Sequence, residues 1–157
     1  MGEVFRCFVE KKPGLDGAAQ ALCRELSEVL GVAGLTGVRI FNRYDVEGVS
    51  PKTYAAARDA IFSEPQVDVV YNEGFPVPGH PHALLAVEAL PGQFDQRADS
   101  AEQCVQFIKE DEKPVIRTAT TYIIHGKGDN CISAEELEAI KNHCINPVDS
   151  REAAAEK

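Results

Sequence analysis

The side chains best placed to do chemistry lie in one polar stretch, residues 93–99, which reads QFDQRAD. Its amides, carboxylates and guanidinium belong to Gln93, Asp95, Gln96, Arg97 and Asp99. Asp95 and Asp99 could work as a general acid and base. The residues themselves favour a simpler interpretation, in which Asp99 or Ser100 caps the helix that follows and Arg97 neutralises Asp95. Gln93, Asp95, Gln96 and Arg97 are then surplus to the local fold, which points to a contact with a partner.

Three further patterns could carry chemistry, and each has a simpler explanation. His143 and Cys144 are neighbours on a predicted helix and point about 100° apart, which is poor geometry for one catalytic site. The pair His80 and His82 could share a metal ion, but no cysteine or carboxylate cluster lies near in sequence to complete the coordination. The glycine-rich segment 126–128 is too short for a phosphate-binding loop.

The composition excludes several classes of function. The chain has 157 residues and a net charge of −9, which repels nucleic acid, and no apolar run approaches the roughly 20 residues of a membrane span. Five widely spaced cysteines and the lack of a signal peptide favour free thiols in a reducing compartment, so we expect a cytoplasmic protein.

Hydrophobic periodicity predicts an α+β protein. We expect strands over residues 4–10, 38–47, 67–71, 83–90 and 115–125, and helices over about 16–30, 51–62, 100–109 and 134–144. Asp16, Ser50 and Ser133 are the expected helix caps, and the pattern S-A-E-E from Ser133 predicts a capping box. The second strand is polar on both faces at residues 42–45, which predicts a bulge that splits it.

Two halves of the sequence resemble each other. Shifting the numbering by 78 places the V-E-x-x-P-G pattern at Val9 on the same pattern at Val87. The same shift aligns arginine, tyrosine and glycine residues of the long strands. We therefore expect an internal duplication, with one half over residues 1–74, a Pro/Gly linker over 75–82, a second half over 83–147 and the start of a further linker over 148–157. Each half should form a sheet with helices on one face, and the halves should be related by an approximate two-fold axis.

Four stretches carry a resemblance to a known family: FVEKKPG from Phe8, NRYDVEG from Asn42, PGQFDQRADSA from Pro91 and INPVDSREA from Ile145. They resemble the N-terminal region of the single-chain form of phosphoribosylformylglycinamidine synthase. In that family this region is a fused duplication of the small PurS subunit. The resemblance covers essentially the whole chain, and the third motif is its most specific part.

The resemblance implies a role in purine synthesis as a docking domain without catalytic residues. Its implied partners are the glutaminase and synthetase domains of the same enzyme, which is a ligase that uses ATP and magnesium; the chain itself is expected to hold neither cofactor nor metal. It is then expected to be part of a longer enzyme, and a homodimer stays open. The candidate interface residues are Gln93, Asp95, Gln96, Arg97, Asp99, Asn42, Arg43 and Asp45. Arg97 is expected to be the main anchor.

Two other functions stay open at the level of sequence. One is a free-standing accessory subunit that recruits separately encoded partners. The other is a small-molecule binding module, since paired α+β units often leave a cleft between them.

Overall fold

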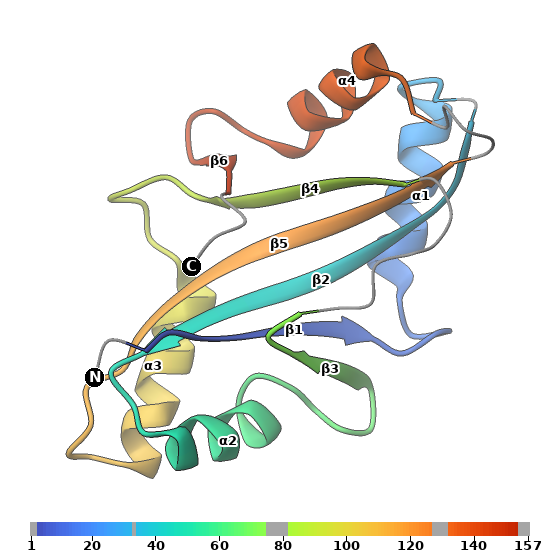
Figure 1. Cartoon of the computed structure of the whole chain (residues 1–157). Helices are drawn as coiled ribbons and strands as arrows, with labels where there is room; N and C mark the ends of the chain where they lie inside the picture. Colours follow the sequence, from blue (N-terminus) through green and yellow to red (C-terminus); the bar gives the residue numbers. More distant parts are fainter. Residues whose placement is uncertain (1–2, 33, 75–81, 127–131, 154–157) are drawn as a thin grey trace.

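We describe the protein from a computed structural model, which covers residues 3–32, 34–74, 82–126 and 132–153. The elements along the chain are β1 (Phe5–Lys11), α1 (Gly17–Glu28), β2 (Leu35–Glu47), α2 (Pro51–Ala60), β3 (Asp68–Asn72), β4 (His82–Ala89), α3 (Gln96–Ile108), β5 (Val115–Gly126), α4 (Ala134–Cys144) and β6 (Ser150–Glu152) (Figure 1). The predicted α+β class is confirmed. Within these ranges, every helix is too short or too polar to cross a membrane.

The six strands form one antiparallel sheet in the order β3-β1-β2-β5-β4-β6. The sequence predicts a sheet in each half, but the two halves share a single sheet. The reason is the long pairing between β2 and β5, which runs from Leu35 opposite Gly126 to Glu47 opposite Val115. The order reads alike from both edges, with β1, β2 and β3 in places that match those of β4, β5 and β6.

The strand register repeats between the two halves. In the first half Val9 of β1 lies opposite Asn42 of β2, and in the second half Val87 of β4 lies opposite Thr120 of β5. Both members of the second pair follow those of the first by 78 residues. Asn42 and Thr120 in turn lie opposite each other where β2 meets β5. The centre of the sheet is therefore the point at which the two halves meet in matching positions.

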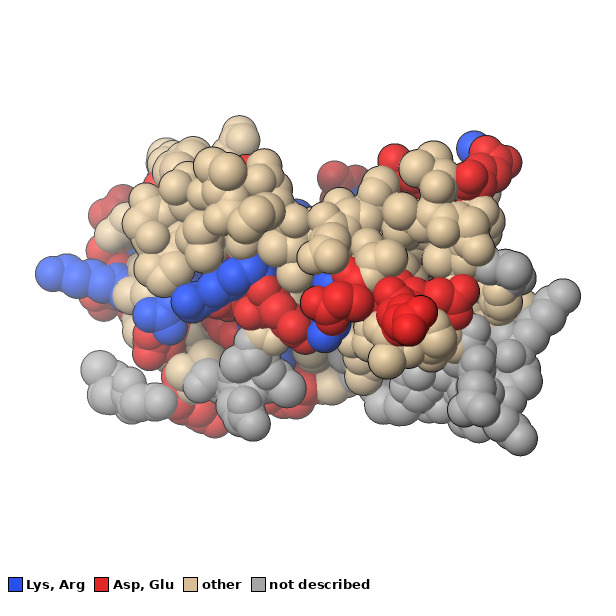
Figure 2. All heavy atoms as spheres, turned by 90° about the horizontal axis from the view of Figure 1, so that it is seen from above, with Lys and Arg blue, Asp and Glu red and all other residues tan. Residues whose placement is uncertain are grey.

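All four helices pack on one face of this sheet, in two pairs. Alternate strand side chains point to this face, and they form two apolar clusters with the helices. One cluster joins α2 and α3 to the sheet through residues such as Tyr54, Val105 and Val46. The other joins α1 and α4 to it through Leu26 and Ile140. The pairs lie over opposite ends of the sheet (Figure 1), and from above the outline shows two bulges with a hollow between them (Figure 2).

The other face of the sheet carries ion pairs and a small aromatic cluster. Arg6 binds both carboxylate oxygens of Asp45 at 2.6 and 2.9 Å. Arg39 binds both oxygens of Glu10 at 2.7 Å. Phe8, Phe41 and Ile123 pack together beside them, and all three are buried. These polar pairs cross neighbouring strands and fix the register between them.

Two helix starts confirm the sequence prediction. Ser50 accepts a hydrogen bond from the Thr53 amide at 3.1 Å and is followed by Pro51 at the first helical position. Ser133 and Glu136 form the predicted capping box. Asp16 stands at the cap position of α1, but its side chain accepts no hydrogen bond from the backbone there.

The structure adds to or corrects the sequence prediction in two further stretches. The stretch 42–45 does not split its strand, because each of its residues pairs in register with both β1 and β5 and the ladder satisfies the polar backbone. Residues 150–152, within the stretch 148–157 that the sequence predicts as the start of a linker, form β6, which pairs with β4 and places Arg151 against Glu88 at 2.7 Å. Short polar sequences of this kind are held by such non-local bonds, which hydrophobic periodicity does not reveal.

Candidate functional site

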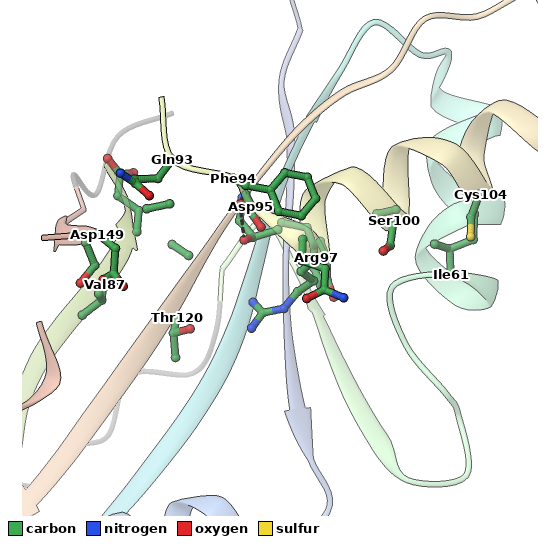
Figure 3. A pocket seen from close by; sticks show the side chains of 18 residues that line it. Ile61, Val87, Gln93, Phe94, Asp95, Arg97, Ser100, Cys104, Thr120 and Asp149 are labelled. Atoms are coloured by element: carbon green, nitrogen blue, oxygen red, sulfur yellow. Dashed lines mark hydrogen bonds between the residues drawn. The ribbon is translucent and has the colours of Figure 1, made fainter. Parts of the chain in front are cut away.

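A groove of about 850 Å³ opens on the helix face, between the start of α3 and the middle of the sheet. Its floor comes from β2, β4 and β5, and its walls come from α3, the turn before α3 and the segment before β6. It is lined by Tyr44, Ile61, Val87, Glu88, Ala89, Gln93, Phe94, Asp95, Gln96, Arg97, Ser100, Ala101, Cys104, Thr118, Ala119, Thr120, Asp149 and Ser150. Figure 3 shows these side chains converging from both sides.

The groove exists because a strand, a tight turn and a helix follow one another here. Pro91 ends β4, and Gly92 takes a φ of 88°, a left-handed conformation that glycine adopts without strain. The turn sends the chain across the sheet, where Ala98, Ala101 and Val105 bury one side of α3. The flank of the helix next to this buried side faces the groove.

Asp95 is the residue that fixes this helix in place. One carboxylate oxygen accepts from the Ala98 amide at 3.0 Å, and the other accepts from the Thr118 hydroxyl at 2.7 Å and the Thr118 amide at 3.3 Å. The predicted cap at Asp99 or Ser100 is therefore wrong, since the helix begins at Gln96. The expected contact of Asp95 with Arg97 is absent too, because Thr118 on β5 supplies the donors that the carboxylate needs.

Arg97 lies in the first turn of α3, half-buried, and points into the groove on the side of Thr120 (Figure 3). Its charge acts on two tyrosines, Tyr44 in the floor and Tyr122 outside the groove: burial raises the pKa of both, and Arg97 opposes the rise in both. Tyr44 and Tyr122 stand on the two central strands, two residues beyond Asn42 and Thr120. Within the described residues, Arg97 makes no hydrogen bond or ion pair, so its guanidinium keeps its donors available.

The other predicted interface residues fall into three places. Gln93 and Gln96 are exposed and line the groove with Arg97. Asp99 does not line it and accepts from the Gln103 side chain at 2.8 Å along the helix. Asn42 lies on the helix face of β2, half-buried, between Val9 and Thr120.

Arg43 and Asp45 belong to the opposite face of the sheet. Asp45 binds Arg6, and the Arg43 Nε lies 3.8 Å from Asp45. Burial and the neighbouring Arg6 lower the pKa of Arg43. The eight candidates therefore do not form one surface: four of them line the groove, while Arg43 and Asp45 are held in contacts beneath the sheet.

The groove also contains residues that the sequence does not single out. Phe94 is 73% exposed at its mouth, where this large aromatic side chain packs little against the described residues. Ile61 and Cys104 form an apolar end between α2 and α3. The one signal in the sequence is the placement of Phe94 among polar residues, where a turn has no need of an aromatic ring.

The structure places His143 and Cys144 in different surroundings. Burial raises the pKa of the Cys144 thiol, which disfavours the reactive thiolate. His143 faces Glu25 of α1, with 3.4 Å between His Nε2 and the carboxylate. No group of three metal-binding side chains occurs among the described residues. The candidate pair His80 and His82 and the segment 126–128 lie wholly or largely outside the described side chains.

In comparisons with known proteins, no family model matches the chain, and no curated protein is significantly similar to it.

Proposed function

We propose that this chain is a non-catalytic docking domain of a phosphoribosylformylglycinamidine synthase, formed by an internal duplication of two PurS-like halves. The observation that carries the proposal is the repeated register: Val9 opposite Asn42 and Val87 opposite Thr120 are the same pairing 78 residues apart. The sequence shift and the strand pairing are independent of each other. Their agreement supports a duplicated unit, which is the organisation that the resemblance implies.

The groove supports docking over catalysis. It is broad and open, its mouth exposes Phe94, and it presents Arg97 without a partner among the described residues. Exposed aromatic and arginine side chains of this kind are typical of protein interfaces. In this role the domain holds the glutaminase and synthetase domains together, so that ammonia released from glutamine reaches the ATP- and magnesium-dependent site. ATP and magnesium bind to the synthetase domain, and the location is cytoplasmic.

The proposal can be tested by reconstitution. The glutaminase and synthetase domains are produced separately and mixed with or without this chain. We expect the chain to form a complex with them and to raise the glutamine-driven rate of formylglycinamidine ribonucleotide formation, while the rate with added ammonia changes little. The chain by itself should hydrolyse neither ATP nor glutamine. A chain that binds neither domain, or that turns over either substrate by itself, refutes the proposal.

Ligand binding is a second candidate function, favoured by the volume of the groove and its polar lining. A small-molecule module would gain thermal stability from nucleotides or glutamine, whereas a docking domain would gain it from a protein partner. A free-standing accessory subunit would share the docking geometry, and the length of the native open reading frame distinguishes it from a domain of a single-chain enzyme.

A further inference from the structure

The groove holds a cation that the described residues leave unmatched. The other arginines that lie partly or fully buried have carboxylate neighbours: Arg6 and Arg43 lie at Asp45, Arg39 at Glu10 and Arg58 at Asp59. Arg97 is half-buried and lacks such a neighbour in this part of the chain. A guanidinium in this position has lost part of its hydration without the compensation of an ion pair.

Two of the three carboxylates that line the groove have partners other than Arg97. Asp95 is engaged by Ala98 and Thr118, and Glu88 is engaged by Arg151. Asp149 is exposed, and no ion pair within the described residues joins it to Arg97. The groove therefore has a fixed set of internal contacts that leaves one positive group pointing into an open cavity.

The surroundings of Arg97 fit a protein segment. Tyr44 and Thr120 form a floor of mixed character below it, and Phe94 stands at the mouth with 73% of its surface exposed. A partner that fills the groove would bury this ring and remove the remaining water from Arg97. Both changes strengthen an ion pair at the centre of an interface, where arginine and aromatic side chains contribute most to affinity.

The charge of the chain narrows the choice of partner. The net charge is −9, and Figure 2 shows acidic side chains in the middle of the face seen from above, beside a row of lysine and arginine side chains. A second copy would bring a further −9 and would be repelled. A basic or neutral protein surface avoids repulsion by the net negative charge of this chain, and a single carboxylate on that surface can form an ion pair with Arg97.

We propose that the groove receives a segment of a basic or neutral protein surface, and that an aspartate or glutamate of this segment forms a paired hydrogen bond with Arg97 while Phe94 packs against its apolar side chains. This inference rests on the proposed docking function and names the chemistry of its partner. The planar guanidinium suits a carboxylate in this way, and a lysine in its place would offer only a point charge.

The test compares Arg97→Gln, Arg97→Lys and the control Arg117→Gln by calorimetric titration into the separately produced glutaminase and synthetase domains. Arg117 is a suitable control because its side chain is 78% exposed on the other face of the sheet, 4.0 Å from Glu47. We expect Arg97→Gln to raise Kd at least about tenfold, Arg97→Lys to raise it less and Arg117→Gln to leave it within about twofold.

Each outcome decides between the proposals. If the wild-type chain binds the domains and Arg97→Gln binds equally well, the inference fails and the docking function stands. If the wild-type chain binds neither domain, both fail. If Arg97→Gln changes the monomer–dimer equilibrium of the chain but not its Kd for the domains, the groove binds a second copy. If free phosphate or acetate stabilises the wild-type chain through Arg97 and the Kd for the domains is unchanged, the groove binds a small anion. Either result overturns the inference. If urea titrations show that Arg97→Gln is already unfolded without urea, Arg97→Lys and Phe94→Ser replace it in the test. An unchanged Kd for both variants then contradicts the inference.

Discussion

The contacts of Asp95 predict that its replacement destabilises the protein while replacement of the nearby Asp99 does not. Asp95 joins the first turn of α3 to β5 through Ala98 and Thr118. Asp99 bonds only to the Gln103 side chain, one turn along the same helix. The two aspartates lie in one helical start and carry the same charge, so they form a matched pair for measuring the cap alone.

The expected cost of Asp95→Ala follows from the bonds that it removes. Loss of a helix cap costs about 1 kcal/mol. The hydroxyl and amide of Thr118 lose a charged acceptor, a contact worth about 1.5–3 kcal/mol when buried and less at this half-buried position. The sum is about 2–3 kcal/mol, which lowers Tm by roughly 5–10 °C for a chain of this size. Asp99→Ala should cost under about 1 kcal/mol, since it removes an exposed pair and a charge near the helix start.

Urea unfolding followed by circular dichroism, together with thermal melts, measures both variants. Thr118→Val provides a further control, because it removes the hydroxyl donor and keeps the side-chain shape. The double variant with Asp95→Ala should then lose less than the sum of the two single changes, since the two residues share a bond. Equal effects of Asp95→Ala and Asp99→Ala, or a larger effect of the second, would show that the helix is capped at Asp99 and would refute the reasoning.

Three further predictions concern glycine and cysteine positions. Gly48→Ala should lower Tm by several degrees in thermal melts, because Gly48 has a φ of 83° and an added Cβ would lie 2.3 Å from the Lys113 carbonyl oxygen; an unchanged Tm would contradict the turn geometry. Thiol labelling of the native protein should reach the exposed Cys104 well before the buried Cys7, as mass spectrometry can show, and the reverse order would contradict the burial. Burial raises the pKa of the Cys7 thiol from 9.0 to about 12, so the folded state holds this proton more tightly than the unfolded state. The free energy of unfolding should therefore fall as pH rises above 9, by up to about 1.4 kcal/mol per pH unit. Cys7→Ala should reduce that slope.

The sequence predicts elements whose signals are local. Ser50 with Pro51, and Ser133 with Glu136, place two helix starts correctly because every group in these caps lies within four residues. The strands are predicted by alternation of apolar and polar side chains, which depends only on the faces of one strand. Such elements need no knowledge of what lies beside them in space.

The wrong predictions involve partners that are distant in the chain. The cap of α3 could not be chosen between Asp95 and Asp99 from sequence, since the choice depends on Thr118, 23 residues away. The contacts of Asp45 depend on Arg6, 39 residues away, and without that partner its polarity indicates a bulge or an interface equally well. The continuous sheet likewise depends on the pairing of β2 with β5, and hydrophobic pattern does not specify that pairing.

The starts of α1 and α3 differ in a way that explains why a polar groove forms in the second half. Asp16 and Asp95 both occupy the cap position, but only the Asp95 side chain accepts a hydrogen bond from a backbone amide of its helix. With the numbering shifted by 78, the counterpart of Thr118 is Ile40, which packs with the apolar cluster under α1 and α4. An isoleucine side chain offers no donor to an aspartate, and the Asp16 carboxylate accepts from the Gln20 side chain instead.

The same comparison bears on the number of partners. Arg97 lies two residues after the cap of α3, and the residue two positions after Asp16 is Ala18, which has no charge to offer. If the halves arose by duplication, they have kept the same order of strands and helices. They differ at the positions of Thr118, which donates to Asp95, and of Arg97, which supplies the positive charge of the groove. A partner that depends on Arg97 therefore finds this anchor in the second half and not at the matching position of the first. The matching strand order and register of the two halves do not imply two equivalent docking sites on the chain.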